Sequence, residues 1–348
     1  MTSHREWEDT GSQLAGLGAI SALEARLENM YGLPYALAVS SATSGLLALG
    51  IVAELAAAEF VTTAYTWGGT VAPFMMLGGR PVFADIDPGT LTLDPRSVER
   101  AITENTRAIV SVDVHGNPAD DASLREIANR HGVLFIADSA QGFGATREGR
   151  PASVLADALV LSFSTGKSLA AGEGGAILTS RPDIYERLLL LTQHPSRVAR
   201  ELGMARRTEH VPLNARMHPA AATRLVAEWD AALASLPARQ AACFEILEAL
   251  AAAGLARDDH LKDRHLVPAF THLTAASSSD EPDLEELTST LDAVGHPAWI
   301  EPAPAILVYE QPGFPAEFRP AAGCLNVMLD QATRRLLIDR RTPARRSA

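Results

Sequence analysis

The feature that most constrains the fold of this chain is a regular alternation of apolar runs and amphipathic segments between residues 19 and 164. The apolar runs have the length of strands and read YALAVS, FVTTAYTW, RPVFADID, RAIVSVDVHG, VLFIAD and DALVLSFS. Segments between them, such as ASLREIANRHG, carry apolar residues at the three-to-four-residue spacing of a helix. Strands that alternate with helices predict an α/β fold with a mainly parallel central sheet covered on both faces.

A change of pattern near residue 230 divides the chain into two predicted domains. Residues 1–230 hold the alternating pattern and an N-terminal helix, and we assign them to a large domain. Residues 231–348 contain a long helical region, a strand in HLVPAFTHLTA and a helix with Pro282 near its start and Gly295 at its end. We assign this part to a smaller C-terminal α/β domain, because 348 residues suffice for both.

Charge and composition exclude several classes of protein. The formal net charge of −12 argues against a nucleic-acid backbone as the main partner. The sequence has no apolar stretch of the length that crosses a membrane, and MTSHREWEDT lacks the apolar core of a signal peptide. Two cysteines, Cys243 and Cys324, do not form a disulfide framework. We therefore expect a cytoplasmic protein that acts on small molecules.

Lys167 lies in LSFSTGKSLAAGEGG, between a predicted strand and a glycine-rich loop. Only two of the 30 basic residues in the chain are lysine, the other being Lys262, so arginine carries nearly all the positive charge. An arginine side chain stays protonated, whereas a lysine amine can lose its proton in a desolvated site and attack a carbonyl. This position therefore indicates a reactive amine.

Polar residues gather at other predicted strand ends, where open α/β sheets place their ligands. Asp138 ends VLFIAD, and Ser41, Ala42 and Thr43 lie where a strand meets a helix start, a place suited to a phosphate. Taken singly, each also fits an ordinary helix cap, and the serines beside the lysine, Ser162 and Ser164, fit ordinary strand-end hydroxyls.

The combination of these residues is more specific than any one of them. A lysine that binds an aldehyde, a carboxylate that keeps a ring nitrogen protonated and a phosphate cradle together suit pyridoxal 5'-phosphate. The sequence thus predicts a site for this cofactor, with no metal.

Five motifs, in order, resemble the DegT/DnrJ/StrS family of sugar and aminocyclitol aminotransferases, which have pyridoxal-phosphate fold type I. They are SSATSGLLAL, AYTWGGTVAPFMMLGGRPVFADID, VDVHGNPADDASLREIANRHGVLFIADSAQGFGA, LSFSTGKSLAAGEGGAILTS and LNARMHPAAA. The resemblance covers residues 19–230. It implies an aminotransferase that takes an amino group from glutamate or glutamine and gives it to a keto-sugar or cyclitol.

The resemblance also implies roles for individual residues. Lys167 matches the lysine that binds the cofactor, Asp138 the partner of the pyridine nitrogen, Gln141 a residue near the ring oxygen and Trp67 the aromatic that stacks on the ring. Four further residues match contacts to the cofactor phosphate, and these are Ala42, Thr43, Ser162 and Asn214. Of these, Asn214 matches an asparagine that reaches the phosphate of the other subunit, which implies a homodimer with shared active sites.

Departures from the family leave the substrate open. The turn before the second strand reads ELAAAEFV in place of a glycine-rich acidic turn, and the C-terminal part resembles the family only loosely. Candidate substrate contacts, each of which also fits surface charge or a loop histidine, are His115, His194, Arg197, Arg206 and Arg216. Two alternatives to transamination remain at this stage: dehydration or aromatisation with the same cofactor, and a non-catalytic regulatory role.

Overall fold

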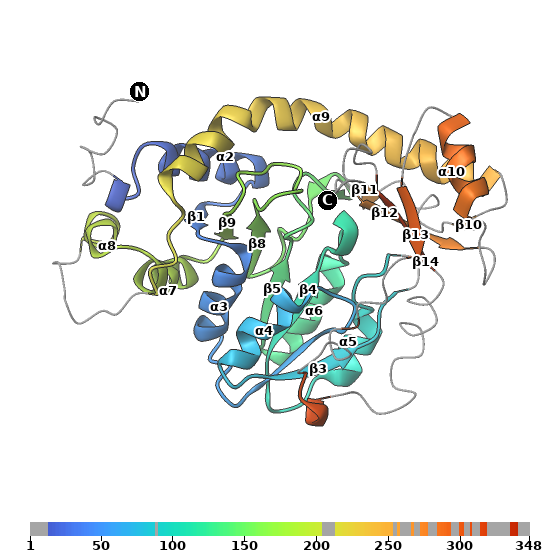
Figure 1. The fold of residues 1–348 in the computed structure, drawn as a ribbon. Coiled ribbons are helices and arrows are strands. Elements are labelled where there is room, and N and C mark those ends of the chain that lie inside the picture. The colour runs from blue at the N-terminus through green and yellow to red at the C-terminus, as the bar shows by residue number, and fades with distance from the viewer. Residues whose placement is uncertain are drawn as a thin grey trace.

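A computed structural model describes residues 13–87, 90–203 and 213–252 and, of the C-terminal part, the segments 256–257, 266–267, 272–277, 284–293, 299–302, 307, 314–318 and 335–339. Its centre is a seven-stranded sheet with the order β1-β9-β8-β5-β4-β2-β3 (Figure 1). The strands are β1 (Tyr35–Val39), β2 (Glu59–Thr63), β3 (Arg80–Ala84), β4 (Thr106–Val112), β5 (Leu134–Asp138), β8 (Ala158–Ser162) and β9 (Gly175–Thr179).

The sheet is parallel except at β9. Pairing is parallel from β3 through β2, β4 and β5 to β8, whereas β9 pairs antiparallel with both β8 and β1. The predicted α/β fold with a mainly parallel sheet is therefore confirmed, although the sequence pattern did not reveal the antiparallel strand β9. Because β1 runs in the same direction as β8, the carboxyl ends of β1, β2, β4, β5 and β8 meet at one edge of the sheet.

Helices cover both faces of this sheet. One face packs on α2 (Ala19–Tyr31), α5 (Pro95–Ala101), α6 (Asp121–His131) and α9 (Pro219–Ala252), and the other on α3 (Ala42–Val52), α4 (Gly68–Met76) and α7 (Pro182–Thr192). The strands alternate accordingly: Phe135 and Ala137 of β5 belong to the first core and Ile136 to the second. Burial on both faces explains why these strands read as continuous apolar runs.

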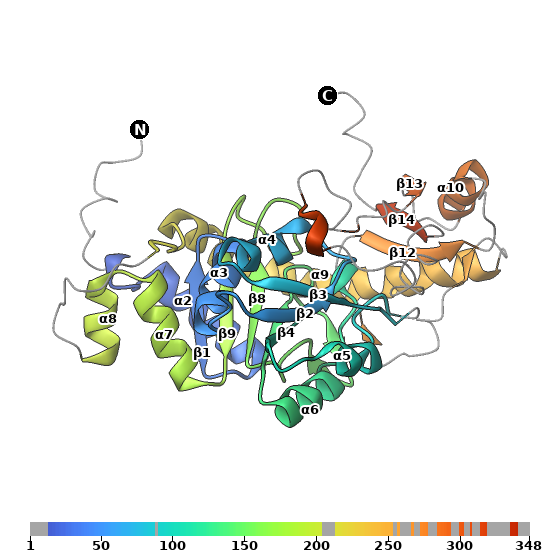
Figure 2. The same ribbon diagram turned by 90° about the horizontal axis from the view of Figure 1, so that it is seen from below.

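The C-terminal part forms a separate antiparallel sheet beside the large one (Figure 2). Its order is β10-β12-β14-β13, and its strands are β10 (Ala256–Arg257), β12 (His272–Ser277), β13 (Trp299–Pro302) and β14 (Arg335–Asp339). Helix α10 (Leu284–Ala293) contacts α9 and β13. Pro282 and Gly295, the predicted ends of this helix, lie outside the described residues, as does Cys324.

Helix α9 runs without interruption through residue 230, so the predicted boundary falls inside a helix (Figure 1). A second link joins the two parts, because β11 (Leu266–Val267) pairs with β6 (Thr146–Arg147), which pairs with β7 (Arg150–Pro151). The division at residue 230 stays a proposal. Within the described part of the chain, no helix is long and apolar enough to cross a membrane.

The outer edge of β1 is closed by side chains. The backbone N–H of Ala38 donates to Oε1 of Glu24 at 2.8 Å, and the Ala38 carbonyl accepts from Nε2 of Gln193. Glu24 is also held by the guanidinium of Arg197, with two N–O distances of 2.9 Å, and Nε of Arg197 lies 2.8 Å from Glu201. This buried ion pair fixes helix α8 (Pro195–Leu202) against α2 and β1.

Arg197 is therefore a structural residue. Only 2% of its side chain is exposed, and its guanidinium pairs with the carboxylates of Glu24 and Glu201. Arg197 is therefore neither a substrate contact nor a surface charge, the two interpretations that the sequence left open. The sequence did not indicate this ion pair, because Glu24 lies 173 residues from Arg197 and meets it only in the folded chain.

We expect the substitution Arg197→Ala to lower the free energy of unfolding by about 3–5 kcal/mol, because it leaves the Glu24 carboxylate buried without its cation. Urea unfolding followed by circular dichroism measures the loss. The control is Arg224→Ala, which removes an exposed pair with Glu228 on α9 and should change stability by less than about 1 kcal/mol. An equal effect of the two substitutions would contradict the structural role of Arg197.

Candidate active site

A cavity of about 530 Å³ opens at the carboxyl edge of the large sheet. Its walls come from the segments that follow β1, β2, β4, β5 and β8, where strand ends leave polar groups facing the ligand side. The cavity is lined by all but one of the predicted cofactor contacts, and these are Ala42, Thr43, Trp67, Asp138, Gln141, Ser162 and Lys167. Tertiary structure thus brings together residues that are spread over 126 positions of the chain.

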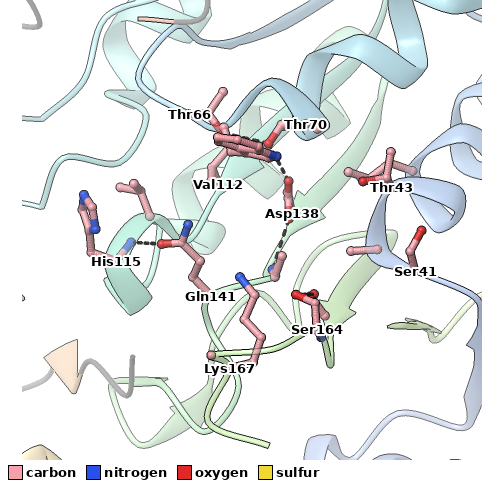
Figure 3. Close-up of a pocket in the computed structure, with 18 of the residues that line it drawn as sticks. Ser41, Thr43, Thr66, Thr70, Val112, His115, Asp138, Gln141, Ser164 and Lys167 are labelled. Carbon is pink, nitrogen blue, oxygen red and sulfur yellow. Dashed lines mark hydrogen bonds between the residues drawn. The ribbon is translucent and has the colours of Figure 1, made fainter. Parts of the chain in front are cut away.

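Asp138 is the buried anion of this cavity. Its side chain accepts a hydrogen bond from Oγ1 of Thr70 at 2.6 Å and another from the backbone N–H of Ala140 at 3.1 Å (Figure 3). Burial raises the pKa of Asp138, while these two hydrogen bonds and the positive charge of Lys167 act against that rise. Both donors fix the carboxylate in one orientation.

Lys167 provides the amine of the cavity. It follows β8 in a loop where its backbone N–H donates to the Ser164 carbonyl, and its side chain points toward the side of the cavity that holds Gln141 and Asp138 (Figure 3). Burial lowers the pKa of Lys167, and the Asp138 carboxylate partly opposes the effect. A depressed pKa increases the fraction of unprotonated amine, which is the form that attacks a carbonyl or accepts a proton.

The start of helix α3 forms one wall of the cavity. Ser41 caps the helix through a reciprocal pair of hydrogen bonds with Ser44, and the first backbone N–H groups of a helix, here those of Ala42 and Thr43, have no partner within the helix. Together with the positive end of the helix dipole they suit an anion. Gly175 is needed behind this turn, because a Cβ there would lie 2.6 Å from the Ala42 nitrogen.

Trp67 precedes helix α4 and lines the cavity with 69% of its surface exposed. A core tryptophan would be buried, so this position is free to bind a planar group. Glycine at position 69 leaves room for the side chains of Trp67 and Thr43. A Cβ at this position would lie 2.9 Å from Cδ1 of Trp67 and 3.2 Å from Oγ1 of Thr43, closer than ordinary van der Waals contact.

The substitution Trp67→Ala should weaken cofactor retention more than it slows turnover of the loaded protein. Stacking on an aromatic face contributes about 0.5–1.5 kcal/mol, which corresponds to roughly two- to tenfold faster cofactor loss. Dialysis followed by absorbance measures the loss. Met76→Ala, which truncates another exposed apolar side chain at the far end of α4, serves as the control. Equal retention in all three proteins would rule out a stacking role.

Gln141 supports the wall opposite helix α3. Its Oε1 accepts a 2.6 Å hydrogen bond from the backbone N–H of His115, which belongs to the short helix η2 (Val114–Gly116). His115 itself lines the cavity and lies 3.0 Å, Nε2 to Oη, from Tyr65. Among the candidate substrate contacts that the structure describes, His115 is the one that lines the cavity of Lys167.

Three of the remaining predicted residues lie elsewhere in the described structure. Asn214 and Arg216 line a second cavity of about 260 Å³ near β1, and Asn214 is exposed there. The Nδ1 of His194 accepts from the Ser196 N–H at the start of α8, so His194 is a helix cap outside the cavity of Lys167. Arg206 lies outside the described residues.

Two residues of the cavity were missed by the sequence interpretation. Thr70 donates to Asp138, and its position three residues after Trp67 in the first turn of α4 was the only available signal. Tyr65 reaches His115 across 50 positions of the chain, a contact that no local pattern indicates.

The donor set of this cavity fits pyridoxal phosphate. It combines one amine, one buried carboxylate held by two donors, an exposed indole and a helix start with free N–H groups. Lys167 could hold the aldehyde of this cofactor, Asp138 could pair with its ring nitrogen and Trp67 could cover its ring face. The Ser41–Thr43 turn and Ser162 could hold its phosphate. Among the described residues, no three side chains of the metal-binding types lie close enough together to hold an ion.

An α/β sheet with a lysine and a buried carboxylate at its carboxyl edge is the arrangement expected of a protein that uses pyridoxal phosphate. The family comparison is specific: the model of the DegT/DnrJ/EryC1/StrS aminotransferase family matches residues 6–311. The chain belongs to this family, as its sequence motifs predicted.

Individual relatives match shorter stretches. The chain is 40% identical, over 161 residues, to a putative L-glutamine:3-amino-2,3-dideoxy-scyllo-inosose aminotransferase of Streptomyces kanamyceticus, covering 46% of this chain and 38% of that protein. It is also 40% identical over 140 residues to a pleiotropic regulatory protein of Geobacillus stearothermophilus, covering 40% of this chain and 38% of that one. The matched stretches thus span less than half the length of these two relatives.

A solved structure extends the likeness over most of the fold. The structure of DesI in the presence of its TDP-sugar product is 29% identical and superposes with a TM-score of 0.75, over 92% of this chain and 79% of that chain. The likeness in structure therefore extends well beyond the stretches matched by the individual relatives.

Proposed function

We propose that this protein is a pyridoxal-phosphate-dependent aminotransferase that moves an amino group from L-glutamine or L-glutamate to the ketone of a keto-sugar or cyclitol. The observation that carries the proposal is the joint presence of the Lys167 amine, the buried Asp138 carboxylate and the α3 helix start in one cavity. The family is one of aminotransferases. One relative is named as a putative L-glutamine:inosose aminotransferase, and DesI was solved in the presence of its TDP-sugar product, which supports this substrate class.

When bound, pyridoxal phosphate supplies an aldehyde carbon for the amino group and a ring that withdraws electrons from the neighbouring carbon. Lys167, with its lowered pKa, would take the proton from the substrate carbon that bears the amino group and deliver it to the former aldehyde carbon of the cofactor. In the second half of the reaction it would move a proton in the opposite direction, from that cofactor carbon to the carbon of the former ketone. Asp138 keeps the ring nitrogen protonated, and Thr70 holds the carboxylate in place. Ala42, Thr43 and Ser162 anchor the phosphate.

Single-turnover measurements with separate amino donors test this function. The cofactor-loaded protein should convert to the amine form of the cofactor with glutamine or glutamate, and the amine form should revert on addition of a keto-sugar or cyclitol ketone. A new amine on the ketone separates transamination from dehydration or aromatisation. A protein that binds the cofactor but converts with neither donor would overturn the proposal in favour of a regulatory role.

The proposed assembly is a homodimer with shared sites. Within one chain, Asn214 lines a different cavity from Lys167 and its side chain is exposed, which supports a contact with the site of a second copy. Asn214 has a φ of +51°, a conformation that asparagine and glycine tolerate.

Mixing an Asn214→Gly protein with a Lys167→Ala protein should restore activity. In the heterodimer, one site carries both lesions, while the other has an intact Lys167 and receives Asn214 from its partner. Each heterodimer should therefore approach half of the wild-type activity, measured by turnover after subunit exchange. Glycine is chosen because it keeps the backbone conformation at residue 214.

The control for this experiment is a tagged pull-down that shows heterodimer formation. If Asn214 acts within its own chain, each heterodimer site carries one lesion. Heterodimers that form without regaining activity would therefore exclude the shared site.

A further inference from the structure

Tyr65 and His115 form a hydrogen-bonded pair inside the active-site cavity that the steps above do not use. The distance from Oη of Tyr65 to Nε2 of His115 is 3.0 Å, and both residues line the same cavity as Lys167. They come from different strand ends, since Tyr65 follows β2 and His115 follows β4. Tyr65 is 5% exposed and His115 is half-buried, so both are held by the protein.

The backbone of His115 is fixed in an uncommon conformation. Its φ of +54° lies in the left-handed region, which few residues other than glycine adopt. Two hydrogen bonds hold the turn: the His115 N–H donates to Gln141 at 2.6 Å, and the Gly116 N–H donates to the Asp113 carbonyl at 3.0 Å. Such conformations persist where surrounding structure determines them, and they cluster at functional sites.

The pair lies on the side of the cavity opposite the phosphate cradle. In Figure 3, Ser41 and Thr43 lie on one side, His115 lies on the other, and Asp138 and Lys167 lie between them. A cofactor with its phosphate at helix α3 and its reactive carbon at Lys167 would therefore leave the His115 side of the cavity open to the ketone substrate. The C-terminal part of the chain borders this side, since β12 contacts η2 and Leu307 forms a backbone bridge with Tyr65.

The chemistry of the pair suits hydroxyl groups. A phenol and a neutral imidazole each combine a donor with an acceptor, and the proton between Oη and Nε2 can belong to either atom, so the pair adapts to a partner that donates or accepts. We propose that Tyr65 and His115 form a subsite that binds hydroxyl groups beside the ketone of the acceptor substrate and thereby determine which ketones the enzyme accepts. This inference rests on the proposed aminotransferase function.

Two substitutions test the subsite. Tyr65→Phe removes one hydroxyl, and His115→Asn keeps a residue that tolerates positive φ while its shorter side chain no longer reaches Tyr65. Each half-reaction is measured alone, with L-glutamine as donor and, as acceptors, 2-deoxy-scyllo-inosose and a TDP-linked keto-sugar. We expect the acceptor half-reaction to lose about tenfold in kcat/KM, and the donor half-reaction to stay within about twofold.

Matched substitutions outside the cavity serve as controls. Tyr35→Phe removes a hydroxyl from a tyrosine that stacks on Tyr185, and His131→Asn alters a surface histidine that pairs with Glu99. Neither should change either half-reaction. Equal losses in both half-reactions for Tyr65→Phe and His115→Asn would show that the pair supports the cofactor rather than the ketone, and unchanged acceptor kinetics would also overturn the subsite.

Calorimetric titration separates failure of the subsite from failure of the proposed function. The same ketones are titrated into the protein loaded with the amine form of the cofactor, and this measurement needs no turnover. Weaker binding to Tyr65→Phe and His115→Asn than to the wild type supports the subsite, even if the wild type converts neither ketone and the proposed function fails. A wild type that binds neither ketone would overturn the subsite.

Discussion

Replacing Lys167 with arginine should abolish the visible absorbance of the cofactor-loaded protein and lower turnover by more than about a thousandfold, while the fold persists. Arginine keeps the positive charge of the cavity but offers no amine that loses a proton at neutral pH. The substitution removes both the covalent attachment and the group that moves the proton, and a positioned proton-transfer group alone contributes about 10²- to 10⁴-fold. Absorbance, turnover and circular dichroism measure the three effects.

The matched control is Lys262→Arg, because Lys262 is the only other lysine of the chain. This protein should keep its absorbance and activity. Borohydride reduction of the wild type, followed by peptide mapping, provides an independent readout, and the cofactor should be found on the peptide that contains Lys167. A cofactor attached to Lys262 instead would contradict the assignment.

The substitution Asp138→Asn should lower turnover by about a thousandfold or more and leave packing unchanged. Asparagine has nearly the same shape and can still accept the hydrogen bond that Thr70 donates. The neutral amide, however, cannot hold a proton on the ring nitrogen, so the ring withdraws electrons less strongly. A thousandfold loss corresponds to about 4 kcal/mol of transition-state stabilisation.

Asp183→Asn provides the comparison for this prediction. Asp183 is a carboxylate that pairs with Arg181 at the start of α7, far from the cavity lining, and its loss should leave turnover unchanged. Cofactor content of the Asp138→Asn protein must be measured in parallel, so that slow chemistry is separated from poor loading. Near-normal turnover of a fully loaded Asp138→Asn protein would refute the role of the carboxylate.

Local sequence determined most of the fold of the large domain. The N-terminal helix predicted from the sequence is α2 (Ala19–Tyr31), and its C-cap is Gly32, whose φ is +65°. The strand predicted in VLFIAD is β5, and the predicted and observed strands both end at Asp138. These elements were predictable because apolar periodicity and caps are local properties. The antiparallel strand β9 was not predicted. Its direction depends on its pairing with β8 and β1, and its own residues carry no signal for that direction.

Sequence motifs also indicated the chemistry of the site. Lys167 was singled out because the chain otherwise uses arginine, and Asp138 because it ends a buried strand. Resemblance to the family added Trp67, Gln141 and the phosphate contacts, and all of these except Asn214 line the same cavity as the lysine. Residue type and strand position were enough to predict that these residues share one site, because the carboxyl ends of neighbouring parallel strands meet at one edge of the sheet.

Tertiary structure alone decided which polar residues touch one another. Arg197 and His115 looked alike as candidate substrate contacts, but a glutamate 173 positions away buries Arg197 in an ion pair, whereas His115 meets Tyr65 in the cavity. Thr70 meets its partner Asp138 only because the folded chain brings the start of α4 to the carboxyl end of β5. The physical reason is that periodicity and caps act within a few residues, whereas a hydrogen bond between distant side chains requires the whole sheet to assemble first.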